Sequence, residues 1–336
     1  MRAIICERPR ELSVVERPQP VRAAGEVKVR INRVGLCGTD FHIFTGNQPY
    51  LNYPRIMGHE LAGQIAEVDG DSTFAPGELV TINPYLPCGT CIACRKGKPN
   101  CCMNIRVMGV HIDGGMTEFV CVPERAVIKV DGLTADQAAM VEFLSIGAHA
   151  VRRASLTAGE RVLVVGAGPI GVAAALFARL AGAEVWIVDT SAQRLEFARS
   201  KLGFAHAHVA DDTLSEWLAS QTQNEGFDCV FDATGNGAAI ERGFQYVAHG
   251  GRYVLLSVVK NNITFADPEF HKREMTLIGS RNATHEDFEY VIESIRTRKI
   301  PTDVLHTHSF QLQDMPTVVP DFLENIGSIL KAIGQQ

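Results

Sequence analysis

Alternating polar and apolar residues mark several short segments near the start of the chain. Glu26–Ile31 alternates in this way, and Leu61–Val68 and Glu78–Ile82 follow a similar pattern. A period of two is typical of strands with one buried face. Gly and Pro residues separate these segments at short intervals and indicate turns. The pattern predicts an irregular β-barrel over residues 1–145.

The pattern changes beyond Arg161, where strand-like segments alternate with stretches long enough for helices. Such alternation is typical of a parallel sheet covered by helices. Six strands match the doubly wound, dinucleotide-binding Rossmann fold, which belongs to the α/β class. The predicted strands are Val162–Val165, Val185–Val188, Ala207–Val209, Cys229–Asp232, Tyr253–Leu256 and Thr276–Ile278.

One further helical stretch, His285–Arg298, follows this region, and the remaining tail is too short to fold alone. We expect the C-terminal segment to rejoin the first domain. The chain is thus predicted to have a first domain over residues 1–145, a dinucleotide-binding domain over 146–281 and a returning segment over 282–336.

The overall charge excludes some classes of function. The 336 residues include 32 Lys and Arg against 38 Asp and Glu, a formal net charge of −6. This balance argues against nucleic-acid binding and against polybasic membrane binding, since both depend on clustered positive charge. The longest uncharged run, Val162–Ala178, contains glycines and a proline and fits a buried strand, turn and helix better than a membrane span. No signal-peptide pattern follows Met1, so we expect a cytoplasmic protein.

A glycine-rich motif follows the first strand of the second region. Gly166, Gly168 and Gly171 form G-x-G-x-x-G, with Pro169 and Ile170 between the last two glycines. The first glycine permits a tight turn, the second lets a pyrophosphate approach, and the third lets the helix pack on the sheet. The helix N-terminus then faces the phosphates. The motif predicts a dinucleotide site.

The next strand ends in Asp189, about 20 residues beyond the motif. A carboxylate at this place accepts hydrogen bonds from the adenosine ribose and repels a 2′-phosphate, which favours NAD. Arg194 lies five residues later and could instead pair with a phosphate. NADP therefore remains the alternative.

Five of the nine cysteines crowd into a segment of fifteen residues. Cys88, Cys91, Cys94 and Cys102 give C-x2-C-x2-C-x7-C, and four thiolates at such spacings can surround one tetrahedral zinc ion. A closed shell of four sulfur ligands predicts a structural ion. An iron–sulfur cluster is the alternative, but the x3-C-P continuation of ferredoxins is absent. By spacing we choose Cys102 rather than Cys101.

Two further segments carry groups that bind metals. Cys37 lies in Gly-Leu-Cys-Gly-Thr-Asp-Phe-His, and His59 and Glu60 follow Gly58, while Glu142 occurs near the domain boundary. A Cys, a His and a carboxylate leave one tetrahedral position open, which is the catalytic arrangement of zinc.

Taken together, these motifs resemble the zinc-dependent medium-chain dehydrogenase/reductase family, whose members are alcohol-dehydrogenase-like. The resemblance covers nearly the whole chain, with all motifs in the family's order. It is closest to the polyol and sugar-acid branch, including sorbitol-dehydrogenase-like and L-galactonate (or L-gulonate) 5-dehydrogenase-like proteins. It implies a GroES-like catalytic domain with a structural zinc lobe over about 86–104, two zinc ions per chain, NAD, and homodimers or homotetramers built on the sheet edge near Thr276–Ile278.

The resemblance also implies residue roles at the catalytic zinc. Cys37, His59 and Glu142 would be ligands, and Glu60 would be a fourth or exchanging ligand. The branch usually has Glu-Pro-Leu at the last of these positions, whereas this chain has Phe143 in place of the proline. Losing the proline frees the backbone beside Glu142.

A proton path and substrate contacts are implied as well. The substrate alcohol would lose its proton through Thr39, the cofactor ribose and His42, and hydride would pass to the nicotinamide to leave a ketone. Phe44, His111 and Arg281 occupy stretches that contact substrate in this family. An arginine facing the substrate favours a sugar acid over a neutral polyol.

Other functions remain open at this point. The chain could be a non-catalytic NAD-binding sensor, or a zinc dehydrogenase with another small substrate, such as an L-threonine-type enzyme. The intact metal-binding residues argue against the sensor. A zinc-ribbon nucleic-acid module conflicts with the acidic charge.

Overall fold

The computed structural model describes residues 1–336, which form two compact units. One unit consists of Met1–Phe143 together with Ala283–Gln336, and the other of Leu144–Asn282. The sequence placed these divisions at 145/146 and 281/282, within two residues of the observed ones. None of the helices combines the length and the apolar character that a membrane crossing requires.

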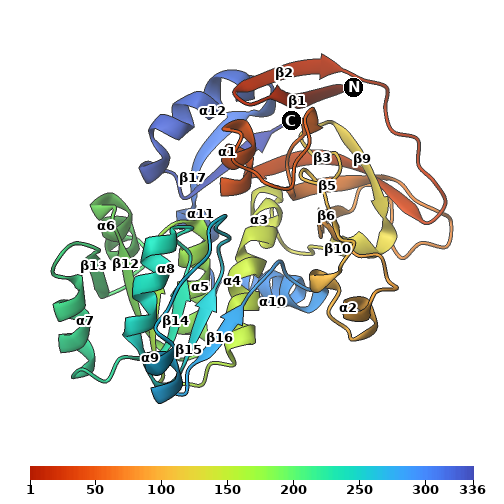
Figure 1. Cartoon of the computed structure of the whole chain (residues 1–336). Helices are drawn as coiled ribbons and strands as arrows, with labels where there is room; N and C mark the ends of the chain where they lie inside the picture. Colours follow the sequence, from red (N-terminus) through yellow and green to blue (C-terminus); the bar gives the residue numbers. More distant parts are fainter. The chain divides into compact units, whose positions relative to one another are not determined.

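The first unit is built mainly from antiparallel strands (Figure 1). Its largest sheet has seven strands in the order β10-β6-β5-β3-β18-β17, with β9 also paired to β3. A smaller sheet has the order β2-β1-β4, and β7 pairs with β8. The bounds are β1 Arg2–Arg8, β2 Glu11–Glu16, β3 Glu26–Leu36, β4 Arg55–Ile56, β5 Glu60–Glu67, β6 Leu79–Ile82, β7 Tyr85–Leu86, β8 Arg106–Val107, β9 Phe119–Pro123, β10 Val127–Lys129, β17 His306–Gln311 and β18 Lys331–Gln335.

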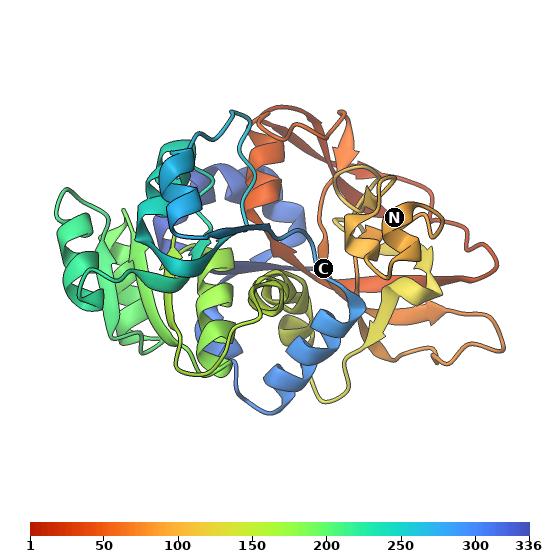
Figure 2. The same cartoon turned by 60° about the horizontal axis from the view of Figure 1, so that its bottom comes forward.

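The C-terminal segment contributes two of these strands to the first unit. β18 pairs antiparallel with β3, so that Gly35 on β3 lies opposite Ile333. The helices of this unit are α1 Gly38–Phe44, α2 Ile92–Arg95, α3 Ala135–Ala139, α10 His285–Arg296, α11 Thr302–Leu305 and α12 Met315–Glu324. Figure 2 shows α10 at the start of the returning segment.

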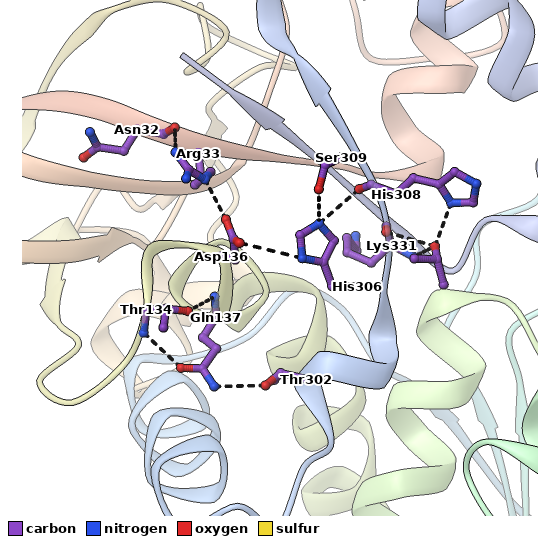
Figure 3. A network of polar contacts seen from close by, with 11 residues as sticks. Asn32, Arg33, Thr134, Asp136, Gln137, Thr302, His306, His308, Ser309 and Lys331 are labelled. Carbon is purple, nitrogen blue, oxygen red and sulfur yellow. Dashed lines mark hydrogen bonds and ion pairs between the residues drawn. The ribbon is translucent and has the colours of Figure 1, made fainter.

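A polar network joins α3 to the strands on either side of it (Figure 3). Arg33 Nε on β3 donates to Asp136 Oδ1 at 2.6 Å, and Asp136 Oδ2 lies 3.8 Å from His306 Nδ1 on β17. Gln137 Nε2 donates to Thr302 Oγ1 at 3.1 Å. These contacts tie the returning segment to the N-terminal part of the unit at a polar surface.

The second unit has six parallel strands in the order β13-β12-β11-β14-β15-β16. The strands are β11 Arg161–Val165, β12 Glu184–Asp189, β13 His206–Val209, β14 Phe227–Asp232, β15 Val247–Leu255 and β16 Thr276–Gly279. The helices are α4 Val141–Ala154, which contains the boundary between the units, α5 Pro169–Leu180, α6 Ala192–Ser200, α7 Leu214–Thr222, α8 Gly237–Gly243 and α9 Asp267–Lys272. The prediction of a doubly wound sheet is confirmed.

β15 begins six residues earlier than predicted, at Val247. Its pairing with β14 shifts register between Phe227 and Cys229, and Gly250 has φ +76°. A glycine with positive φ inside a strand marks an irregularity of the pairing. The glycine pair Gly250-Gly251 interrupts the alternation of polar and apolar residues, so the sequence pattern did not reveal the first part of the strand.

One ion pair of the second unit gives a pH-dependent contribution to stability. Glu160 Oε1 lies 2.6 Å from Arg252 Nη2, and both side chains are largely buried. Burial raises the pKa of Glu160, but hydrogen bonds from Thr157 and Arg252 outweigh it and lower the pKa. Because the pKa of Glu160 is lower in the folded state than in the unfolded chain, its ionised form stabilises the fold at pH values above the ordinary glutamate pKa of about 4.3. This stabilisation is lost as the pH falls.

We therefore expect Glu160→Gln to reduce the free energy of unfolding by about 1–2 kcal/mol at neutral pH. The difference from the unsubstituted protein should shrink as the pH falls below about 4.3. Urea unfolding at several pH values measures both. Glu225→Gln is the matched control, because Glu225 also pairs with an arginine but is mostly exposed, and little change is expected. A difference that grows toward acid pH would contradict this account.

Candidate functional site

Four cysteine side chains converge in the segment between β7 and β8. The Sγ atoms of Cys88, Cys91, Cys94 and Cys102 all lie within 4.8 Å of one another. The sulfur of Cys91 lies 3.5 Å from that of Cys94 and 3.8 Å from that of Cys102. A tetrahedral zinc ion with Zn–S of about 2.3 Å has sulfurs about 3.8 Å apart. We call these residues the four-thiol group; Cys101 is exposed and outside it.

Backbone N–H groups point at these sulfurs. Cys88 N–H donates to the sulfur of Cys102 at 3.2 Å, and Met103 N–H donates to the sulfur of Cys91 at 3.4 Å. N–H groups of Thr90 and Cys91 lower the pKa of Cys88 to about 5. The pKa of Cys91 is lowered as well, whereas burial raises that of Cys94 to about 12. Two of the four sulfurs thus favour the thiolate form that zinc binds.

A second convergence joins Cys37, His59 and Glu60, whose ligand atoms also lie within 4.8 Å of one another. Cys37 is the residue before α1, and the other two stand at the start of β5. Glu60 lies opposite Gly35 on β3, where a Cβ atom would meet Glu60 Oε2 at 2.1 Å. Gly35 therefore makes room for the carboxylate. We call these three residues the reactive-metal group.

Asp40 orients this group, and the sequence analysis gave it no role. Its carboxylate accepts from Cys37 N–H at 2.9 Å and from Gly58 N–H at 3.3 Å. Asp40 Oδ1 lies 4.0 Å from His59 Nδ1. Asp40 therefore holds the backbone at Cys37 and at the residue before His59. The local signal was the three-residue spacing from Cys37, which is that of a capping box.

Lys331 on β18 contacts Glu60 and was also missed. Its Nζ lies 2.6 and 2.7 Å from the two carboxylate oxygens of Glu60, 3.0 Å from Leu36 O and 4.2 Å from the centre of the Phe143 ring. Both members of this ion pair are completely buried. Phe143, which stands where the resemblance led us to expect a proline, thus supplies an aromatic face for the ammonium group.

Glu142 was expected as a metal ligand, but its carboxylate is not part of the reactive-metal group. It accepts a hydrogen bond from the hydroxyl of Tyr85, and both residues are buried. Burial raises the pKa of Glu142 to about 7, and the charge of Glu60 contributes. Of the two candidate carboxylates, the structure thus brings Glu60 rather than Glu142 to Cys37 and His59.

The reactive-metal group fits a metal ion. Burial lowers the pKa of His59, but Cys37, Asp40 and Glu142 raise it well above its ordinary value. The buried Nδ1 atom of His59 has no hydrogen-bond partner. A thiol, an imidazole and a carboxylate are the donors that zinc takes. A cation among these groups relieves the repulsion between their negative charges.

The other predicted residues of the first unit lie as follows. Thr39 and His42 are on α1, the first half-buried and the second exposed. Phe44 is buried at the end of this helix. His111 stacks on Tyr50 with ring centres 6.2 Å apart, and its Nδ1 accepts from Val107 N–H.

The glycine-rich turn has the local geometry that the motif predicts. Gly166 has φ +102°, and a Cβ on Gly171 would lie 1.8 Å from Gly166 O. Gly168 precedes α5, where a Cβ would meet only the guanidinium of Arg194, at 3.7 Å. Pro169 and Ile170 begin the helix. The first N–H groups of α5 are therefore available to an anion.

Asp189 ends β12 beside this turn. Its carboxylate accepts from Ala167 N–H at 2.6 Å and from Ser191 N–H at 2.7 Å. Arg194 Nη1 lies 3.9 Å away. Arg281, the last predicted residue, is exposed after β16 in the second unit.

Comparisons with known proteins agree with these features. Residues 23–132 match the alcohol dehydrogenase GroES-like domain, and residues 169–297 match the zinc-binding dehydrogenase family. L-galactonate-5-dehydrogenase of Escherichia coli (strain K12) is 39% identical over 99% of this chain and 98% of its own length. The 2-dehydro-3-deoxy-L-galactonate 5-dehydrogenase of Pseudoalteromonas atlantica (strain T6c / ATCC BAA-1087) is 33% identical over 87% of this chain and 86% of its own.

A solved structure extends the likeness to the whole fold. The short chain alcohol dehydrogenase (rspB) of E. coli CFT073, complexed with NADH, matches with a TM-score of 0.94 and 30% identity, covering 100% of this chain and 99% of that one. The predicted family, fold class and zinc dependence are confirmed. This chain is an enzyme of the zinc-binding dehydrogenase family, with an alcohol dehydrogenase GroES-like domain and a Rossmann domain.

Proposed function

We propose that this enzyme oxidises a secondary alcohol of a sugar acid or polyol to a ketone, with NAD as the hydride acceptor. The observation that carries the proposal is the reactive-metal group, in which His59 and Glu60 are buried and Asp40 holds the backbone at Cys37. Two relatives are named as 5-dehydrogenases of galactonate-type sugar acids, which favours a sugar acid. A sensor without catalysis would have no need for this arrangement.

Each metal ion has a separate task in this proposal. The four-thiol group would hold a structural zinc ion, and the reactive-metal group a catalytic one, giving two zinc ions per chain. When bound, the catalytic ion supplies Lewis acidity, which makes the substrate hydroxyl easier to deprotonate. The chain's own residues then orient the substrate and accept its proton.

We assign the movement of the proton to α1. Thr39 and His42 lie three residues apart, which places them on one face of the helix. Thr39 is half-buried near Cys37, and His42 is exposed. A hydroxyl can pass a proton, and an exposed imidazole can take it up and release it to solvent. Phe44, His111 and Arg281 remain candidates for substrate contacts.

The preference for NAD rests on Asp189, and it gives a testable prediction. We expect Asp189→Asn to raise the ratio of kcat/KM with NADP to that with NAD by about 10–100-fold. The amide keeps an oxygen acceptor for Ala167 N–H, but the negative charge that repels a 2′-phosphate is gone. Steady-state kinetics with both cofactors measure the ratio.

A second substitution controls this experiment. Adding Arg194→Met to the Asp189→Asn variant should reduce the use of NADP again, because Arg194 Nη1 lies 3.9 Å from residue 189 and can pair with the phosphate. An unchanged cofactor ratio in the single variant would contradict the assignment of Asp189.

A panel of aldonates and polyols with NAD or NADP tests the proposed substrate class. Formation of reduced nicotinamide, followed by its absorbance, is expected with a sugar acid that carries a secondary alcohol. The bound zinc is determined by atomic emission in the same preparation. Absence of turnover on every secondary alcohol, with two zinc ions per chain present, would refute the proposal.

Finally, we propose a homodimer or homotetramer in the cytoplasm. β16 is the edge strand of the six-stranded sheet, and its Leu277 side chain is 40% exposed. An open edge with an apolar residue can pair with a second copy. All nine cysteines are free, which suits a reducing compartment. Light scattering measures the oligomeric state.

A further inference from the structure

The hydrogen bond between Tyr85 and Glu142 connects β7, which precedes the four-thiol group, with the start of α4. Tyr85 lies on β7, paired with Val107 on β8, three residues before the first cysteine of the four-thiol group. Its N–H donates to Asn83 Oδ1 at 3.1 Å. The backbone therefore fixes where this buried hydroxyl lies.

Glu142 lies close to the reactive-metal group. It directly precedes Phe143, whose ring centre is 4.2 Å from Lys331 Nζ, and this ammonium group contacts both carboxylate oxygens of Glu60. A buried carboxylate without a partner is unstable, and the strongest available partner would be the metal. The hydroxyl of Tyr85 is a different partner for this carboxylate, because it donates its single proton in a hydrogen bond.

A further carboxylate on the metal would oppose catalysis. A zinc ion with three protein ligands keeps a fourth position for substrate, whereas four ligands give the closed shell of structural sites. We propose that Tyr85 is a positioning residue, whose hydroxyl holds Glu142 outside the reactive-metal group and so keeps a metal position available to substrate. This inference rests on the proposed zinc-dependent function and adds to it a device that selects between two carboxylates.

The Tyr85→Phe variant of the full-length enzyme tests the proposal. Removing the hydroxyl frees Glu142, and we expect it to become a metal ligand. Two consequences follow: the visible spectrum of the cobalt-substituted enzyme changes, because a carboxylate takes the position that was open to solvent and substrate, and zinc binds the reactive-metal group about tenfold more tightly. The kcat should fall. Absorption of a Cys37→Ser variant, which retains the four-thiol group, is subtracted to isolate the reactive site.

The sign of the affinity change separates positioning from a structural role. A substitution that only damages the packing or orientation of the ligands weakens metal binding, by about 10–100-fold when the replaced residue contacts a ligand. Adding Glu142→Gln to Tyr85→Phe should return the cobalt spectrum and the zinc affinity toward those of the unsubstituted enzyme, since an amide is a poor ligand. Tyr53→Phe is the matched control, because Tyr53 donates to the backbone oxygen of Ile43, and no change is expected.

An unchanged cobalt spectrum in Tyr85→Phe, or weaker zinc binding, would overturn the proposal. So would a change that persists when Glu142→Gln is added. The spectra need no substrate. A failed substrate panel therefore refutes the proposed function alone, while a failed cobalt experiment with normal turnover refutes the role of Tyr85 alone.

Discussion

Replacing Lys331 by methionine is expected to reduce the unfolding free energy of the metal-free enzyme by about 3–5 kcal/mol. Lys331 Nζ contacts both carboxylate oxygens of Glu60, and neither side chain reaches solvent. Methionine fills similar space but leaves the carboxylate buried without its cation. The loss should be smaller with zinc bound, because the ion then gives Glu60 another positive partner.

Urea unfolding of metal-free and zinc-loaded protein measures both effects. Lys129→Met is a matched control, since Lys129 has the same kinds of partner at the surface. Its Nζ lies 3.1 Å from Glu78, 2.8 Å from Thr73 O and 5.3 Å from the centre of the Phe74 ring. An exposed pair contributes less than about 1 kcal/mol. Equal losses of unfolding free energy in Lys331→Met and Lys129→Met would show that burial does not determine how much the ion pair contributes to stability.

The sequence predicted those parts of the site whose geometry is local. The four-thiol group and the glycine-rich turn each lie within one short segment, so that residue spacing alone constrains which atoms can meet. The parallel sheet followed from alternating strands and helices, because a crossover connection allows few arrangements. Asp40 could also have been found, since its spacing from Cys37 is short and typical of a helix start.

The missed contacts join residues far apart in the chain. Lys331 and Glu60 are separated by 271 positions, and Tyr85 and Glu142 by 57. No spacing rule predicts such pairs; they depend on β18 lying beside β3 and on β7 reaching the start of α4. The same contacts bring Glu60, rather than Glu142, into the reactive-metal group. The sequence supplied both Glu60 and Glu142, but only tertiary packing distinguishes them.

Replacing Cys102 by serine is expected to release one of the two zinc ions and to destabilise the four-thiol lobe. The lobe has little apolar burial of its own, with Ile92 50% and Met103 73% exposed. A structural zinc ion binds with roughly 10–16 kcal/mol in small zinc-dependent domains, and this becomes folding free energy. The loop between α2 and Pro99 should then open, exposing the bond after Lys96 further to trypsin.

Cys101→Ser is the matched control, because it makes the same chemical change one residue away, at an exposed thiol outside the group. We expect it to retain two zinc ions and normal resistance to trypsin. Atomic emission gives the zinc content, and mass spectrometry of the fragments locates the cleavage. Since Tyr85 lies three residues before Cys88 on the same backbone, the loosened lobe should also lower turnover, although none of its cysteines belongs to the reactive-metal group. Full activity with one zinc ion per chain would show that the lobe does not support Tyr85.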